Sequence, residues 1–408
     1  MRNSLVRRAS ACAVASCLAA VAAIGCETGG VVGGGGGPGT SGPGITGPGT
    51  TGPGTTGGET SHAPATPVSG CEVDSDLELG AGDSPAIAAG NGRFAIAWID
   101  PAQGGDVMLT LADESGQSVH QERIAAGPAA AVSPTIAAIP GGFLVAWEEL
   151  AGAGGTVRAV RVGADGRPQG GAITLATAGS AEAHPDAATT ASGALVAWTE
   201  ANGAVVGEIR DGALAGKMSL PGAAQAAVAG TRGGLAAVWS AGPSLGFARL
   251  PAALSTAGAA MNVVTFRAAA GRANIPRLAA GPDGSYAVVW EDTRGGPDNE
   301  AVYIATVGAG GQPSAEMQVS PPGGSANYPD VAFIGGRAAV TYYQWRDHPS
   351  AVYLTLIDPG HGRVGKDLQI SDEEPARLPR IAAGAGGTLG VAYAQRGGSV
   401  RLAVVSCK

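Results

Sequence analysis

The last third of the 408-residue chain gathers charged, amide and aromatic side chains in two loops and beside three prolines. Guanidinium groups bind carboxylates and phosphates in a planar fork, and an indole outside a core offers a flat face for a sugar ring. Such a gathering is typical of a ligand site, although loops are also polar because they face water. The candidate ligand-binding residues are Asn274, Arg277, Asp292, Arg294, Asp298, Asn327, Tyr328, Asp330, Trp345, Arg346, Asp347, His348 and Arg380.

One of these loops also offers oxygen atoms to a metal. Asp292, Asp298, Asn299 and Glu300 lie within it, and Ca²⁺ takes roughly six to eight oxygen ligands. Their spacing follows no known calcium-binding loop. We therefore expect no cofactor, and Ca²⁺ is the alternative that this loop leaves open.

Motifs for catalysis are weak. Gly242-Pro243-Ser244-Leu245-Gly246 has the letters of a serine-hydrolase nucleophile elbow. It lies between two expected strands, whereas the elbow joins a strand to a helix. No pair of histidines beyond His62 has the spacing of metal ligands. We expect a protein that is not an enzyme.

The chain begins with an export signal. Three arginines within the first eight residues precede an apolar stretch that is shorter than the roughly 20 residues of a membrane-spanning helix. The stretch ends in Ala23-Ile24-Gly25-Cys26, which resembles the lipobox of bacterial lipoproteins. The resemblance implies removal of residues 1–25 and acylation of Cys26, with palmitate among the chains, at the outer membrane or cell surface. An ordinary signal peptide cut nearby is the alternative.

Residues 26–70 are expected to form a flexible linker. A unit that opens Gly-Pro-Gly recurs there every five residues, and few side chains are available for burial. Beyond it the chain carries no run of basic residues, and its formal net charge is −8. This balance argues against a nucleic-acid partner, because phosphate binding needs clustered Lys and Arg.

From residue 71 onward one unit recurs seven times. Each copy has a proline (alanine in the fourth copy), a turn, and an alternating apolar run that ends in an aromatic residue. The seven aromatic residues are Trp98, Trp147, Trp198, Trp239, Trp290, Tyr342 and Tyr393. A period of roughly 40–50 residues with four short strands per unit is typical of propeller blades. We predict an all-β, seven-bladed β-propeller of four-stranded blades over residues 71–408; tandem β-sandwiches and a β-solenoid fit this period less well.

The two ends of the repeat predict how the ring closes. The seventh unit stops after its third strand at residues 400–405, and an unassigned strand, Leu77-Glu78-Leu79, precedes the first proline. We expect this strand to complete the seventh blade. Cys71 and Cys407 then lie together, and an oxidising compartment favours a disulfide between them.

The repeat resembles bacterial propellers grouped with the sialidase-like superfamily, and Trp290-Glu291-Asp292-Thr293-Arg294-Gly295 is the copy closest to theirs. Sialidases use an arginine triad, a Tyr–Glu nucleophile pair and an aspartic acid/base. Arg277, Arg346 and Arg380 have the right type to converge, but the Arg-Ile-Pro opening and the Asp-box repeats are absent. The resemblance therefore implies the architecture and not the activity.

These patterns favour a monomeric, lipid-anchored binding protein of the cell envelope. Its membrane attachment is the lipid on Cys26, and its partner is a protein or a glycan engaged by the face of blades five to seven. The alternatives are a divergent sialidase-like glycosidase or lyase, and a purely structural envelope component.

Overall fold

The computed structural model describes residues 70–408, apart from 126–128, 152–153, 179–182, 232–233, 255–261, 268–270, 297, 346–348 and 373–374. Contacts divide the chain into Met1–Ser61 and His62–Lys408, and all described residues belong to the second unit. The expected signal peptide at residues 1–25, Cys26 and the linker as far as residue 69 lie outside the described residues.

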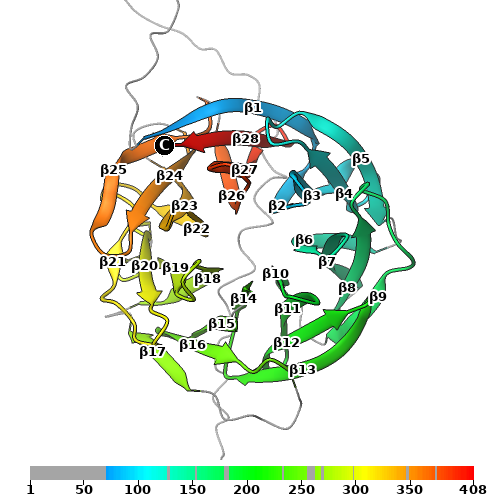
Figure 1. Ribbon diagram of the computed structural model, residues 1–408, viewed down its shortest axis with the longest axis horizontal. Coiled ribbons are helices and arrows are strands. Elements are labelled where there is room, and N and C mark those ends of the chain that lie inside the picture. Colours follow the sequence, from blue (N-terminus) through cyan, green and yellow to red (C-terminus); the bar gives the residue numbers. More distant parts are fainter. Residues whose placement is uncertain are drawn as a thin grey trace, which may run out of the picture. The chain divides into compact units, whose positions relative to one another are not determined.

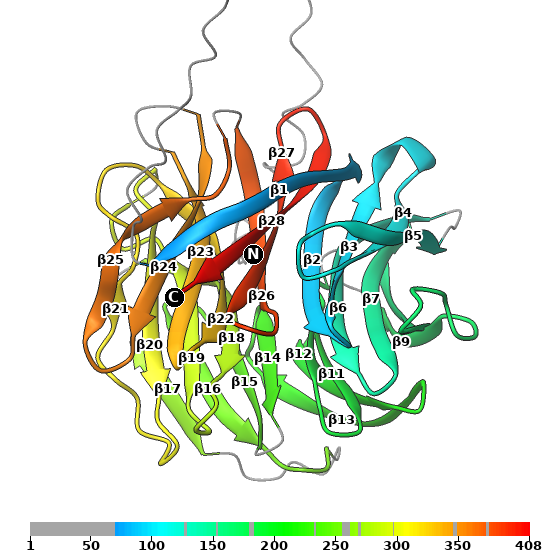
Figure 2. The same ribbon diagram turned by 45° about the horizontal axis from the view of Figure 1, so that its top comes forward.

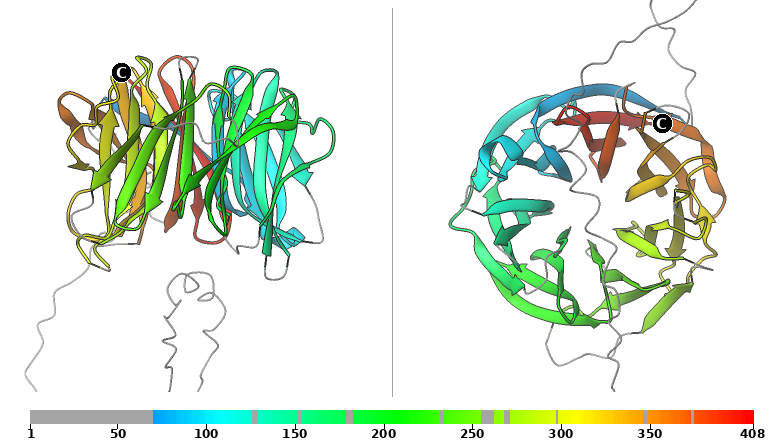
Figure 3. Two further views of the ribbon diagram at one scale, coloured as in Figure 1. Left: turned by 90° about the horizontal axis from the view of Figure 1, so that it is seen from below. Right: turned by 180° about the vertical axis from the view of Figure 1, so that it is seen from behind.

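Seven four-stranded antiparallel sheets form a ring, which confirms the predicted architecture (Figure 1). The first strand of each of the first six blades, and β26 (Ala376–Ala383) in the seventh, lies nearest the central axis, and Figure 3 shows these strands from the side and from behind. The only helical element in the described part of the chain is the 3₁₀ turn Pro101–Gln103. No helix there is long and apolar enough to cross a membrane.

The blades follow the chain in order. Blade one is β2 (Asp83–Gly90), β3 (Arg93–Asp100), β4 (Asp106–Ala112) and β5 (Ser118–Ala125), and blade two is β6 (Ala130–Ile139), β7 (Gly142–Ala151), β8 (Gly154–Gly163) and β9 (Ile173–Ala178). Blade three is β10 (Asp186–Thr189), β11 (Gly193–Glu200), β12 (Gly203–Arg210) and β13 (Ala213–Pro221), and blade four is β14 (Ala226–Thr231), β15 (Gly234–Ala241), β16 (Ser244–Leu250) and β17 (Val263–Arg267). Blade five is β18 (Ala273–Ala280), β19 (Tyr286–Asp292), β20 (Ala301–Val307) and β21 (Met317–Gln318), and blade six is β22 (Ala326–Ile334), β23 (Arg337–Gln344), β24 (Ala351–Asp358) and β25 (Gly362–Gln369).

Blade seven joins the two ends of the repeat region. It consists of β26 (Ala376–Ala383), β27 (Thr388–Gln395), β28 (Ser399–Cys407) and, as its outermost strand, β1 (Cys71–Ala81). Figure 2 shows β1 beside β28. Strand β1 is longer than the expected 77–79 and pairs with β28 from the Cys71–Cys407 pair to Ala81–Ser399. The predicted closure and the predicted Cys71–Cys407 disulfide are both confirmed.

The core lies between the blades. The repeat tryptophans of β3, β7, β11 and β19 are each 1% exposed, and each packs in a cluster that joins neighbouring sheets. Burying a large apolar side chain stabilises the fold by roughly 1.5–3 kcal/mol. Regular recurrence of such a residue therefore specifies both the blades and their stacking.

Candidate functional site

Each innermost strand begins at the same face of the ring, which we call the entry face. It also carries the loops that follow the second strands, because the start of β18 pairs with the end of β19 through Ala273 and Asp292. In six blades the residue before the repeat proline has a positive φ between 43° and 54°. These residues are Ser84, Ser133, His184, Ile275, Tyr328 and Leu378. Non-glycine residues rarely adopt this conformation, and its clustering around a channel marks the entry face as a candidate site.

The residue after each repeat proline forms a second layer, which we call the inner ring. From blade one to blade seven it consists of Ala86, Thr135, Asp186, Ala227, Arg277, Asp330 and Arg380. Just before Arg277, Asp330 and Arg380 the pairing with the second strand shifts register. The innermost strand carries one extra residue there relative to its partner. The predicted residues Arg277, Asp330 and Arg380 therefore occupy equivalent places on three successive blades.

The polar members of the inner ring hold adjacent innermost strands together. Asp186 Oδ2 accepts a hydrogen bond from the Val228 N–H at 2.9 Å, and Asp330 Oδ2 accepts one from the Ile381 N–H at 3.0 Å. The Thr135 hydroxyl oxygen accepts the equivalent hydrogen bond from the Ala187 N–H of the next blade. An innermost strand presents unpaired backbone N–H groups toward the axis, so a short acceptor side chain at this place satisfies them.

The guanidinium groups of the two inner-ring arginines have few hydrogen-bond partners. Arg277 Nη1 donates to the Pro276 carbonyl at 3.2 Å. Arg277 Nε and Arg380 Nη1 are buried and have no hydrogen-bond partner among the described residues. Burial and the charge of Arg277 lower the pKa of Arg380 to about 10, although the charges of Asp330 and Asp186 oppose this shift. The four charged residues of the ring therefore act on one another across the channel.

Asp186 was not among the sequence candidates, although the structure places it in this group. Burial raises its pKa, while the charges of Arg277 and Arg380 act in the opposite direction. Its position directly after the third repeat proline was the available signal.

Glu291 is a second residue that the sequence candidates omitted. It is the penultimate residue of β19, is 8% exposed, and accepts a hydrogen bond from the Tyr328 N–H at 3.5 Å. Burial and the charge of Glu300 raise its pKa to about 7, although the hydrogen bonds from the Tyr328 N–H and the Asn274 side chain oppose this rise. Its signal in the sequence is its place immediately after the repeat tryptophan, which it shares with Glu148.

Glu291 and its neighbours form what we call the mouth cluster: Glu291, Glu300, Ser325, Tyr328 and Trp345. The Ser325 hydroxyl donates to Glu300 Oε2. The backbone N–H of Trp345 donates to the Ser325 carbonyl at 3.1 Å. The ring of Tyr328 stacks on Tyr343 with centroids 5.9 Å apart. Tyr328 also lies close enough to Arg380 to affect its pKa, which links the mouth cluster to the inner ring.

Trp345 is the exposed member of the mouth cluster. Its side chain is 53% exposed, whereas the repeat tryptophans are between 1% and 6% exposed. A large aromatic residue left in solvent is a common feature of binding sites.

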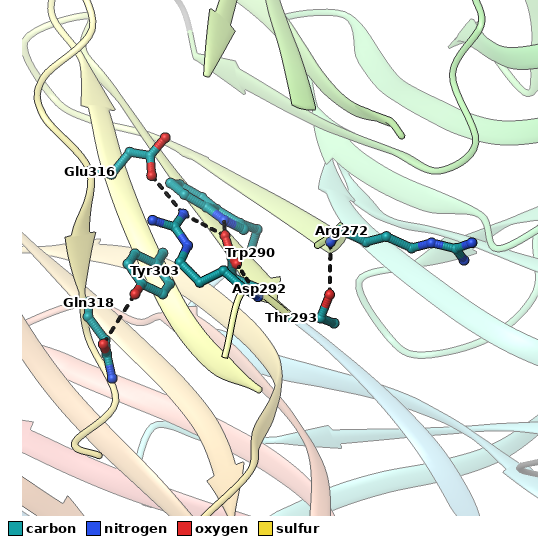
Figure 4. A network of polar contacts seen from close by, with 8 residues as sticks. Arg272, Trp290, Asp292, Thr293, Tyr303, Glu316 and Gln318 are labelled. Atoms are coloured by element: carbon teal, nitrogen blue, oxygen red, sulfur yellow. Dashed lines mark hydrogen bonds and ion pairs between the residues drawn. The ribbon is translucent and has the colours of Figure 1, made fainter. Parts of the chain in front are cut away.

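Asp292 and Arg294 lie inside blade five and not in the mouth cluster. Figure 4 shows Asp292 beside Trp290. Asp292 is fully buried and accepts hydrogen bonds from Trp290 Nε1 at 2.9 Å and Arg294 Nη2 at 2.6 Å. Arg294 also binds Glu316 at 2.7 Å and stacks 4.0 Å from the centroid of Tyr303. Burial raises the pKa of Asp292, but the hydrogen bonds from Arg294 and Trp290 outweigh burial and the pKa is lowered. The two side chains are thus bonded to each other, to Trp290 and to Glu316 inside the blade.

The remaining candidates are dispersed. The Asn274 side chain hydrogen-bonds to Glu291. Asn327 is partly buried and pairs with Tyr343 between β22 and β23. Asp298 is exposed, with a φ of 68°. Arg346, Asp347 and His348 lie outside the described residues. Within the described ranges no group of three or more His, Cys, Asp or Glu is placed to hold a metal ion.

The elbow-like Gly-x-Ser-x-Gly segment is part of a β-hairpin. Ser244 begins β16 and pairs with Ala241 across the turn. Gly246 is required there by packing, because a Cβ on this residue would lie 2.4 Å from the ring of Trp239. The segment has no strand-to-helix turn of the kind that a nucleophile elbow needs.

Comparison with known proteins supports the fold alone. No family model and no curated protein matches the chain. A solved protein of unknown function from Dyadobacter fermentans is 12% identical, with 83% of this chain and 100% of that chain covered and a TM-score of 0.53. The β-propeller domain of Cps50 (Swd1) from Myceliophteria thermophila is 13% identical, with 80% of this chain and 98% of that chain covered and a TM-score of 0.51. The NanB sialidase from Streptococcus pneumoniae is 8% identical, with 81% of this chain and 70% of that chain covered and a TM-score of 0.46. It adds only that sialidase folds are among the structural neighbours.

Proposed function

We propose that this propeller is a non-catalytic binding module of the bacterial cell envelope that engages a glycan or a protein at the mouth cluster. The observation that carries the proposal is the exposed side chain of Trp345, whose backbone N–H donates to the Ser325 carbonyl while the Ser325 hydroxyl donates to Glu300. An aromatic face gives a ligand apolar contact area, and the neighbouring carboxylates fix its orientation through hydrogen bonds.

The lipid anchor is part of the same proposal. Acylation of Cys26 attaches the chain to a membrane, because each buried CH₂ contributes about 0.8 kcal/mol and several chains hold firmly. Metabolic labelling with a palmitate analogue tests this step. Label on the wild-type chain and none on Cys26→Ser supports the anchor, and equal labelling of both contradicts it.

A thermal-shift screen of the full chain against neutral sugars, acidic sugars and acidic peptides tests the binding site. A ligand at about 100 times its Kd stabilises a protein by about 2.7 kcal/mol, which moves the Tm measurably. We expect a saturable shift that Trp345→Ala abolishes. Val263→Ala is the matched control, since Val263 is a 49% exposed apolar residue on blade four. A shift that survives Trp345→Ala, or no shift with any ligand, contradicts the proposal.

A second candidate function is a divergent glycosidase or lyase. The observation that favours it is Glu291, whose pKa is raised to about 7 beside Glu300. A carboxyl that is half protonated near neutral pH can act as a general acid or base. Release of new reducing ends or unsaturated sugars from a polysaccharide, lost in Glu291→Gln, supports this candidate; an unchanged polysaccharide supports the binding module.

A further inference from the structure

We propose that the Cys71–Cys407 disulfide is a mechanical clamp, which carries a pull on the N-terminal linker past β1 and into the interior of blade seven. This inference rests on the lipid anchor of the proposed function, because a pull arises only when the chain is held at its N-terminal side. It adds a mechanical device to that function, since the clamp keeps the ring closed while a bound partner moves relative to the membrane.

The linker joins the propeller at the end of the closing strand. Gly70 is exposed and directly precedes β1, and its carbonyl accepts a hydrogen bond from the Lys408 N–H at 2.8 Å. Cys71 is the first residue of β1, lies opposite Cys407 at the end of β28, and is bonded to it. The disulfide therefore lies where a pull on the linker first reaches the folded ring.

The linker and the mouth cluster lie at opposite faces of the ring. Gln395, at the end of β27, pairs with Ala376 at the start of β26 and with Ser399 at the start of β28, so these three residues lie at the entry face. Strand β28 then runs to Cys407 at the other face. A pull between a ligand at the mouth cluster and an anchored linker therefore has to cross the ring.

Without the disulfide the whole pull falls on β1. This strand is the outermost one of blade seven and pairs with β28 alone among the described strands. A pull at Cys71 breaks this ladder from its first pair onward, and a register shift between Val73 and Ser75 already interrupts it near that end. Loss of β1 leaves blade seven with three strands and exposes an unpaired edge on β28, which removes the closure of the ring.

With the disulfide the pull passes through the two sulfur atoms to β28. This strand pairs with β1 on one side and with β27 on the other, so two ladders hold it. The Cys407 N–H also donates to the Gly387 carbonyl at 3.1 Å. Moving Cys407 requires hydrogen bonds on both sides to break together, which costs more free energy than breaking those of an edge strand one after another.

Burial of the bridge fits a permanent clamp better than a redox switch. Cys71 is 2% exposed and packs in the core cluster that contains Leu389 and Val405. A thiolate has to reach a sulfur atom before it can break a disulfide, so burial slows exchange. The bridge is therefore protected at the place where the pull is applied.

Optical tweezers on the full chain test the inference in two pulling geometries. In the first, one handle is attached at the N-terminus and the other at Asn202, an exposed residue between β11 and β12 of blade three. In the second, the handles are attached at Asn202 and at Ala309, an exposed residue after β20 of blade five, so the direct path runs through blade four. An azide-bearing amino acid at each internal handle position leaves the cysteines unchanged.

Cys71→Ser/Cys407→Ser should weaken the chain in the first geometry alone. At the same constant load we expect it to open about tenfold faster or more than the wild type, which is the change in rate when the barrier loses about one hydrogen bond. In the second geometry the two chains should open at similar rates. If the double variant does not fold, the wild-type chain that is reduced after attachment takes its place.

The outcomes separate the clamp from a general stabiliser and from the anchor. Equal opening rates in the first geometry, or the same acceleration in both geometries, overturn the clamp. Acceleration in the first geometry without palmitate label on Cys26 supports the clamp and contradicts the lipid anchor. Label on Cys26 without this acceleration keeps the anchor and overturns the clamp.

Discussion

The indole Nε1 of Trp290 donates a hydrogen bond to Oδ2 of Asp292, two residues further along the chain, at 2.9 Å. Blades two and three repeat this relationship with a glutamate in the second position. The carboxylate satisfies an indole N–H that is buried with its ring. Acidic residues at this place in the repeat therefore have a structural role in these three blades.

Replacing Asp292 should destabilise blade five. Asp292→Ala leaves the Trp290 N–H and one bond of Arg294 unmet in a buried place, so we expect a loss of about 3 kcal/mol or more in the free energy of unfolding. Urea denaturation of the full chain measures it. Glu78→Ala, at an exposed position on β1, should change stability by less than about 0.5 kcal/mol. Equal stability of the two variants would contradict this role.

Glu291 should make stability fall as the pH rises. Its pKa is about 7 in the folded chain, so between about pH 4.5 and 7 the native state holds a proton that the unfolded chain has released. Stability is then greatest below about pH 4.5 and decreases toward pH 7, by up to about 3 kcal/mol for this group.

Glu291→Gln tests the pH effect because the amide keeps an oxygen for the Tyr328 N–H and does not ionise. We expect the variant to melt at a higher temperature than the wild type at pH 8 and at the same temperature at pH 4. Glu78→Gln, an exposed change on β1, serves as the control. A difference between Glu291→Gln and wild type that is the same at both pH values would show that Glu291 does not titrate in this range.

The Cys71–Cys407 disulfide should stabilise the ring substantially, since it joins residues 336 positions apart. Chain-entropy models give up to about 5 kcal/mol for a long closed loop. Replacing both cysteines by serine should lower the urea midpoint and remove its dependence on reductant. Equal midpoints for the oxidised and reduced wild-type chains would contradict this contribution.

The closure of blade seven has a second attachment that does not depend on the disulfide. The Tyr393 hydroxyl donates to Asp76 Oδ2 at 2.6 Å, and Arg401 Nε donates to Asp76 Oδ1 at 3.1 Å. Tyr393→Phe should cost about 1.5–3 kcal/mol, because a hydrogen bond to a charged partner is lost. The matched change Tyr303→Phe affects a longer and exposed contact, 3.2 Å to Gln318 Oε1, and should cost less. The reverse order in urea denaturation would contradict the role of Asp76.

The propeller could be predicted from the sequence because its signals are local and repeated. The spacing from proline to aromatic defines the blades, and an incomplete last unit together with Cys71 and Cys407 predicts the closure. The electrostatic interactions of Asp186 with Arg277 and Arg380 depend on the ring itself, which brings blades three, five and seven around one axis. No short-range pattern contains that information.

Burial was the other quantity that the sequence did not supply. Asp292 and Glu291 are adjacent in the chain, yet Asp292 is bonded inside blade five while Glu291 reaches the mouth cluster. Strand alternation explains the difference, since successive side chains point to opposite faces of a sheet. The register that decides which residue takes which face became clear only from the pairing of β18 with β19.

Titration of the full chain with the ligand that gives the largest thermal shift, followed by mass spectrometry of the recovered ligand, tests the central claim most directly. We predict one ligand bound per chain, recovered at its starting mass, and no saturable binding by Trp345→Ala. A ligand recovered as a shorter product, or equal binding by the wild type and Trp345→Ala, would contradict a non-catalytic binding site at the mouth cluster.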